Sequence, residues 1–208
     1  YTATDLRADI LHKEGEKNSG SKEPYLPGII SVISEAGKNF YSDSLEVRGR
    51  GNASWNFPKK PYKLKLANKK RLLDMPAKAR KWTLINNYGD KTLMRNALAF
   101  KISEAIGMDY TPACRLVDVI VNGEYEGTYQ LCDQIEIRKN RVGITEMAPV
   151  DIAEPNLSGG YLLEVDAYAD QEKSHFTTSS SAYSLPVTIK SPDEDDIVPQ
   201  QFNDIKDY

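Results

Sequence analysis

The sequence has 208 residues, of which 40% are hydrophobic and 27% charged, enough to bury the core of one domain or slightly more. No apolar run approaches the roughly 18 residues that a helix needs to span a bilayer, which excludes a helical membrane span. The net charge of -3 hides an uneven distribution, because residues 48–81 hold twelve Lys or Arg and a single acid, Asp74. Such a segment indicates a face that attracts anions, and a solvated lysine-rich surface is the alternative.

The first half of the chain alternates polar loops with short strand patterns. Residues 12–24 are polar and aperiodic, so we expect residues 1–27 to be a flexible N-terminal segment. Strands are predicted at Ile29–Ile33 and Ser44–Arg48, with a turn at residues 35–39 between them. The run Tyr62–Leu66 alternates strictly between apolar and basic residues, which places Lys60 on the inward face together with Tyr62.

One prominent helix is predicted in the middle of the chain. It follows a short strand at Trp82–Ile85 and runs from Lys91 to Ile106, with Asp90 as the N-cap and Gly107 just past the end. Apolar residues recur along it at helical spacing and form a wide face. We therefore expect this helix to pack against a sheet instead of standing in water.

A β-hairpin is predicted around Asn122-Gly123, because both central residues of a type I′ turn need positive φ. Its strands are Cys114–Val121 and Gly127–Cys132. The turn pairs residue 121 with residue 124, and this register places Cys114 and Cys132 on opposite faces of the hairpin. We therefore expect the two cysteines to remain unpaired with each other.

The last part of the chain reads as a strand at residues 159–166, a serine-rich loop at 177–181, a strand at 185–190 and a helix starting at Asp193. Together these elements predict an α+β fold with a mostly antiparallel sheet and one prominent packed helix. The predicted domains are the flexible segment 1–27, a nucleotide-binding domain over 28–190, and an acidic stretch over 191–208.

The strongest chemical signal is the run Arg48-Gly49-Arg50-Gly51-Asn52, followed by Lys59-Lys60. Glycines allow backbone amides to approach a phosphate closely, and neighbouring Arg and Lys neutralise its charge. The run is no Walker A loop, because Gly-Lys-Ser/Thr does not follow the glycines. The alternative is that these glycines only form a tight turn.

This basic run, combined with two later segments, closely resembles the CotH kinase family. The likeness extends from about Ile29 to Val165. These segments are Lys81 to Phe100, with its Asn-Tyr-Gly-Asp turn and Leu-Met-Arg-Asn helix start, and Val121 to Tyr129. The resemblance implies a distant relative of the protein kinase N-lobe. It also implies phosphoryl transfer from ATP, with Mg²⁺, to Ser or Thr of proteins.

The resemblance assigns site residues one by one. Lys60 matches the phosphate-binding lysine of a kinase N-lobe best, and Arg48 and Lys59 are neighbouring phosphate contacts. Arg95 stands in the helix where a kinase uses a glutamate to hold that lysine, and Asp133 supplies the acid instead. The structural alternatives are that Arg95 bridges to a backbone carbonyl and that Asp133 caps a turn.

One departure from the family concerns the catalytic and metal-binding aspartates, which the family carries in a C-terminal region, the second of them within a Trp-Asp-x-Asp type motif. The two tryptophans here, Trp55 and Trp82, are followed by Asn56 and Thr83. We therefore predict no catalytic and no metal-binding residue in this chain and no phosphoryl transfer by it alone. Residues 191–208 would be the start of a missing C-terminal lobe, packed loosely.

Two other functions compete with a kinase-like role. A non-catalytic secreted or surface module would use the basic segment 48–81 for a polyanion, and nucleic acid is the less favoured third partner. The resemblance implies a nucleotide and a protein substrate as partners, and an extracytoplasmic or cell-surface location in a bacterium.

Overall fold

The computed structural model describes residues 25–33, 39–179 and 183–208. The chain divides into two compact units, Tyr1–Arg141 and Val142–Tyr208, which are described separately below. The predicted flexible segment 1–27 lies almost entirely outside the described residues, and so does most of the turn predicted at 35–39.

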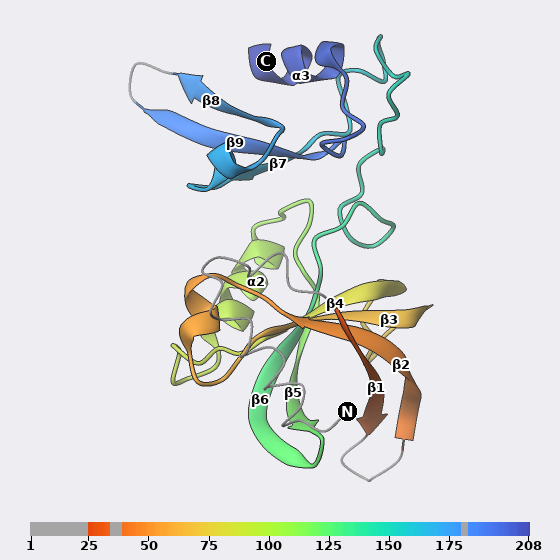
Figure 1. The fold of residues 1–208 in the computed structure, drawn as a ribbon, viewed down its shortest axis with the longest axis vertical. Helices are drawn as coiled ribbons and strands as arrows, with labels where there is room; N and C mark the ends of the chain where they lie inside the picture. Colours follow the sequence, from red (N-terminus) through yellow and green to blue (C-terminus); the bar gives the residue numbers. More distant parts are fainter. Residues whose placement is uncertain (1–24, 34–38, 180–182) are drawn as a thin grey trace. The chain divides into compact units, whose positions relative to one another are not determined.

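The first unit is built on one antiparallel sheet that curls around its core (Figure 1). Its strands lie in the order β1-β2-β3-β4-β6-β5. Their bounds are β1 Leu26–Ile33, β2 Asn39–Gly49, β3 Tyr62–Lys70, β4 Ala79–Ile85, β5 Cys114–Val121 and β6 Glu124–Asp133. A short 3-10 helix, η2 at Ala53–Asn56, interrupts the loop between β2 and β3.

The alternation predicted in β3 is confirmed, because Tyr62, Leu64 and Leu66 are 3%, 6% and 0% exposed. Their register partners on the neighbouring strands point to the same side and form a continuous apolar cluster. We call this side of the sheet the core face. The opposite side, the polar face, carries Glu46, Arg48, Lys63, Lys65, Lys81, Thr83, Gln130 and Cys132.

The β5–β6 hairpin turns at the predicted residues, with φ of 50° at Asn122 and 86° at Gly123. Its register shifts between Val119 and Ile120, because Glu126 forms a bulge that has no partner opposite it. Beyond this bulge Cys114 lies directly opposite Cys132. The expectation that the cysteines lie on opposite faces is therefore wrong; both are free thiols in this structure.

Helix α2 spans Arg95–Ala105 and therefore begins four residues later than predicted. Asp90 still supports its start, since its Oδ2 accepts a hydrogen bond from the backbone N–H of Arg95 at 2.8 Å. Gly107 ends the helix with a φ of 75°, as predicted.

The expectation that α2 packs its apolar face against a sheet is wrong, because no residue of the helix is buried. Met94, Leu98, Ile102 and Ile106 are each more than half exposed. A polar contact ties the helix to the turn after β4, where Asn96 donates a hydrogen bond to Asn87 at 2.7 Å. Periodicity shows that a helix has an apolar face, but it does not show what covers that face.

The second unit holds a three-stranded antiparallel sheet of order β7-β9-β8, with the short helix η3 and the C-terminal helix α3 (Figure 1). The bounds are β7 Leu162–Val165, η3 Ala169–Gln171, β8 His175–Ser179, β9 Ser184–Ser191 and α3 Pro199–Asp207. Residues 177–179 form a strand where a loop was predicted, and the rest of that loop, residues 180 and 181, lies outside the described residues.

Helix α3 starts at Pro199 and not at Asp193, which belongs to a turn closed by the bond from Ile197 N to Asp193 O. Gln201 is fully buried and donates from Nε2 to Ala148 O at 2.8 Å. Phe202 contacts Phe176 edge-on, with ring centroids 6.2 Å apart. The C-terminal segment is therefore packed, in contrast to the loose packing expected from the sequence.

The fold class agrees with the prediction: the protein is α+β, mostly antiparallel, with helices α2 and α3. Among the described residues, no helix is long and apolar enough to cross a membrane.

Candidate functional site

Basic side chains face one another across the polar face. Arg48 of β2 lies directly opposite Lys63 of β3, and the same row continues through Thr83, Cys132 and Cys114. Like charges placed opposite each other on neighbouring strands destabilise a sheet. The row therefore concentrates positive charge on one face of the sheet, which is typical of a site for an anion.

The adjacent row on the polar face is partly neutralised. Lys65 lies between Glu46 and Lys81, and its Nζ makes an ion pair with Glu46 at 2.7 Å. Arg48 and Lys65 both stack on the ring of Tyr25, at 4.9 and 5.4 Å from its centroid. The aromatic ring holds these two cations at one edge of the face.

Arg50 extends the basic row beyond the end of β2. Its backbone N–H donates to Pro61 O at 3.2 Å and so continues the ladder between β2 and β3. Its Nε is shielded from solvent and has no hydrogen-bond acceptor within residues 25–33, 39–179 and 183–208. Desolvation lowers the pKa of Arg50, against the opposite influence of Cys132 nearby. A buried donor without an acceptor costs free energy in the ligand-free protein.

A second unsatisfied donor lies on the same face. Gln130 is fully buried, and its Oε1 accepts a hydrogen bond from Asn87 at 3.1 Å. In the described part of the chain, nothing accepts a hydrogen bond from its Nε2. The polar face therefore offers two buried N–H donors, from Arg50 and Gln130, in addition to its cations.

The Asn-Tyr-Gly-Asp turn links this face to α2 and to the basic loop. Asn87, with a φ of 47°, bridges Asn96 of α2 and Gln130 of β6. Asn86 donates from Nδ2 to Lys59 O, which ties the loop between β2 and β3 to the end of β4. The motif that carried the family resemblance is thus a structural junction.

The two predicted phosphate lysines contact the protein itself. The Lys60 Nζ donates to Trp55 O at 2.7 Å and lies 5.0 Å from the centre of the Trp55 ring. The Lys59 Nζ donates to Thr128 O and lies 4.3 Å from the centre of the Tyr129 ring. Desolvation lowers the pKa of Lys59.

The structure does not bring these lysines together with Arg48. Trp55 and Tyr129 belong to the apolar cluster of the core face, whereas Arg48 alternates with Val47 and Gly49 and points to the polar face. Gly51, with a φ of 88°, makes the tight turn that was the alternative reading of the glycines, since a Cβ there would overlap Ser54 Oγ.

Arg95 and Asp133, the other two predicted site residues, lie apart as well. The Arg95 side chain is 81% exposed and its Nε lies 3.6 Å from Asp90 Oδ1. Asp133 is buried and accepts a hydrogen bond from Arg141 Nε at 3.0 Å and one from Ala113 N at 3.2 Å. The acid expected beside Lys60 is thus engaged by Arg141.

Arg141, which sequence reasoning missed, is the centre of a buried network. Its side chain is fully buried, bonds Asp133, Glu136 and Lys81 O, and lies 4.9 Å from the centre of the Trp82 ring. Only its sequence position, in a loop eight residues after Asp133, could have suggested a pair. Burial of a guanidinium with two carboxylates indicates a structural role at the end of the sheet.

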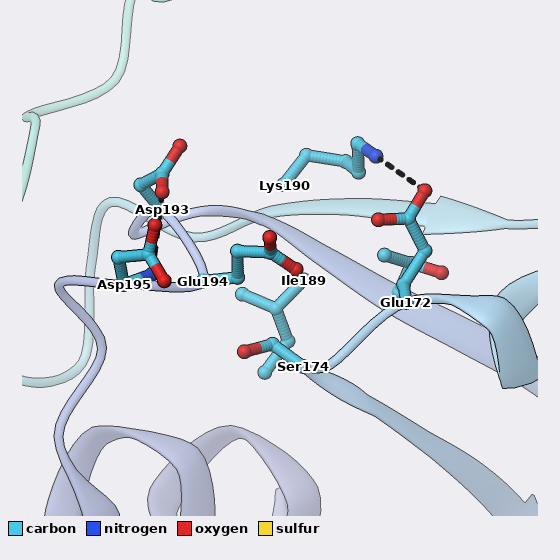
Figure 2. A pocket seen from close by; sticks show the side chains of 8 residues that line it. Glu172, Ser174, Ile189, Lys190, Asp193, Glu194 and Asp195 are labelled. Atoms are coloured by element: carbon cyan, nitrogen blue, oxygen red, sulfur yellow. Dashed lines mark hydrogen bonds and ion pairs between the residues drawn. The ribbon is translucent and has the colours of Figure 1, made fainter. Parts of the chain in front are cut away.

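The second unit contains an acidic hollow of about 380 Å³ (Figure 2). It is lined by Glu172, Ser174, Thr188, Ile189, Lys190, Asp193, Glu194 and Asp195. Lysines already engage these acids: Lys173 Nζ lies 2.8 Å from Asp195, and Lys190 Nζ lies 3.4 Å from Glu172. Figure 2 shows Asp193, Glu194 and Asp195 on one segment, separated from Glu172 by Ile189 and Ser174.

Groups of three or more His, Cys, Asp or Glu able to hold a metal ion are absent from the described residues. Asp166 accepts a hydrogen bond from Tyr168 N at 3.2 Å in a turn.

In a comparison with protein families, residues 47–208 match the family described as CotH kinase protein. The match covers more than half of the chain and includes the basic row, the Asn-Tyr-Gly-Asp turn and strands β3 to β9. No curated protein matches the chain.

Proposed function

The chain belongs to the CotH kinase family, and we propose that it binds the phosphates of a nucleoside triphosphate, ATP, on the polar face of its six-stranded sheet. The observation that carries this proposal is the opposition of Arg48 and Lys63, with Arg50 next to them. Several cations on one face of a sheet create a positive local potential, and such a potential attracts an anion.

Phosphate oxygens fit the donors on this face. A phosphate accepts several hydrogen bonds at once, and arginine presents a planar fork that matches it. Arg50 Nε and Gln130 Nε2 are buried donors that lack an acceptor among the described residues. A ligand with several acceptor atoms would accept hydrogen bonds from both donors. The ammonium groups of Lys59 and Lys60, in contrast, already contact aromatic rings of the protein.

The described residues do not fit a magnesium ion of their own. Mg²⁺ takes oxygen ligands, mainly carboxylates and phosphates, whereas the basic row holds cations, and the described residues contain no group of three metal-ligating side chains. Magnesium enters the proposal only as the counterion that ATP carries.

The wider proposal is phosphoryl transfer from ATP to Ser or Thr of secreted or surface proteins in a bacterium, and it rests on the family alone. We also predict that these 208 residues transfer no phosphate by themselves, because neither Trp55 nor Trp82 is followed by an aspartate as in the family's Trp-Asp-x-Asp type motif. Incorporation of radiolabel from ATP into protein tests it, and metal-dependent incorporation by the 208 residues would contradict it.

Nucleotide binding is tested by thermal unfolding with ATP, with and without Mg²⁺. A ligand at about 100 times its Kd stabilises a protein by about 2.7 kcal/mol, which raises the Tm by several degrees. The informative variant is Arg50→Met, which keeps the apolar stem and removes the charge. We expect its ligand-free Tm to equal or exceed that of the wild type and its ATP affinity to fall by roughly tenfold or more.

Lys69→Ala is the matched control, because Lys69 is an exposed cation of the same basic segment. It should bind ATP as the wild type does. Equal affinity of Arg50→Met and Lys69→Ala would overturn the proposed site. Stabilisation by heparin or DNA but not by ATP would instead support the polyanion-binding alternative.

A further inference from the structure

We infer that Cys114 and Cys132 form a thiol pair that oxidises to an intramolecular disulfide across the β5–β6 hairpin. The two residues are direct register partners on the antiparallel strands β5 and β6. Both are free thiols in this structure. The inference is independent of the proposed nucleotide site.

The hydrogen-bond pattern shows which type of pair they form. Asp133 N donates to Ala113 O at 3.0 Å, immediately beyond the two cysteines. In an antiparallel ladder, a bond between the residues next to a pair shows that the pair itself is not hydrogen-bonded. Residues 114 and 132 are therefore a non-hydrogen-bonded pair. The Cα atoms of such a pair are about 4.5 Å apart, and their side chains approach each other more closely than those of hydrogen-bonded pairs.

This geometry falls inside the range of a disulfide. Bridged cysteines have Cα atoms roughly 4.4 to 6.8 Å apart and Cβ atoms that point to the same side. Direct partners share a face of the sheet, so both thiols point to the polar face. The electrostatic influence of Cys114 on Cys132 agrees with this proximity, and desolvation chiefly raises the pKa of Cys132 to about 12.

Exposure fixes the order of the reaction. Cys132 is 2% exposed, whereas Cys114 is partly accessible. With a low-molecular-weight disulfide such as glutathione disulfide as oxidant, the thiolate of Cys114 attacks one sulfur and releases one thiol. The sulfur of Cys132 loses its proton and attacks the mixed disulfide at Cys114, releasing the second thiol. Two protein thiols are oxidised, and one glutathione disulfide is reduced to two thiols.

The resulting bond closes the hairpin at the end opposite its turn. Cross-linking a loop of this size stabilises mainly by limiting the unfolded chain, and we expect the Tm of the first unit to rise by roughly 5–10 °C. Addition of dithiothreitol should reverse the shift.

The test incubates the folded protein, at low concentration, with glutathione disulfide. Expected results are the loss of both free thiols, an intact mass lower by two hydrogen atoms, and a peptide map that joins the segments of residues 114 and 132. A product with glutathione on either cysteine, an intermolecular dimer, or two unreacted thiols overturns the inference.

The matched control moves one thiol to the other side of the strand. In the double variant Cys114→Ser with Arg115→Cys, the new thiol is at an exposed position opposite Leu131, on the face away from Cys132. It should take up glutathione and form no bond to Cys132. A disulfide to Cys132 in this variant as well would show that the hairpin does not hold the register on which the inference depends.

Discussion

Tyr129 donates a hydrogen bond from its hydroxyl to the backbone carbonyl of Lys60 at 2.9 Å. Its ring also lies 4.3 Å from the ammonium group of Lys59. One fully buried side chain of β6 thus fixes both lysines that the sequence assigned to phosphate binding. The loop between β2 and β3 is positioned from the core face of the sheet.

The first prediction concerns this contact. Tyr129→Phe keeps the ring and removes the hydroxyl, which leaves a carbonyl without its donor, so we expect a loss of about 1–2 kcal/mol in the free energy of unfolding. Urea unfolding followed by tryptophan fluorescence measures it, because both tryptophans belong to the first unit. Tyr125→Phe removes an exposed hydroxyl bond to Asp118 and should cost less than about 0.5 kcal/mol.

A second prediction separates the two possible places for phosphate. Because the Lys60 Nζ is bonded to Trp55 O, we expect Lys60→Ala to lower stability and to leave ATP affinity within about twofold of Lys69→Ala. Arg48→Met should weaken ATP binding by roughly tenfold. Titration calorimetry on the three variants compares them, and a tenfold loss in Lys60→Ala would restore Lys60 as the phosphate-binding lysine.

The buried network of Arg141 gives a third prediction. Arg141→Met leaves the carboxylate of Asp133 buried without its partner, and we expect a loss of about 3–5 kcal/mol in the free energy of unfolding. Adding Asp133→Asn to Arg141→Met should restore a large part of this loss, because no buried charge remains. Arg138→Met, which removes a more exposed ion pair with Glu136, should cost less than about 1 kcal/mol.

A fourth prediction concerns acid conditions at the start of α2. The hydrogen bond from Arg95 N, followed by that from Thr92, lowers the pKa of Asp90. A carboxyl group whose pKa is lowered by folding stabilises the fold above its unfolded pKa of about 3.9 and loses this contribution as the pH falls through its folded pKa. The backbone amide of Arg95 should therefore exchange hydrogen faster, relative to its intrinsic rate, as the pH falls from 5 to 2.

Asp90→Asn provides the control, since an amide oxygen still accepts the bond but does not titrate. Its relative exchange rate at Arg95 should change little over the same range. An equal pH response in both proteins would show that Asp90 does not control the start of α2.

Local pattern was sufficient for strand β3 and for the turn between β5 and β6. The alternation in Tyr62–Leu66 identified the core face, and Asn122-Gly123 located the hairpin turn, because each depends on residues close in sequence. The same is true of the end of α2 at Gly107, which needs only a positive φ. The sequence by itself thus determined an α+β protein with a mostly antiparallel sheet and the family to which it belongs.

Tertiary structure decided which side chains meet. A single bulged residue, Glu126, shifted the hairpin register by one, so that Cys132 lies on the same face as Cys114. No local rule predicts where such a bulge occurs. The nearby carbonyl of Trp55 engaged Lys60, and the ring of Tyr129, distant in sequence, engaged Lys59 on the core face. Arg48 instead met Lys63 on the polar face. The sequence alone showed that the segment is basic. The distribution of its side chains between two faces depended on the strand register, because the whole sheet sets the pairing between strands.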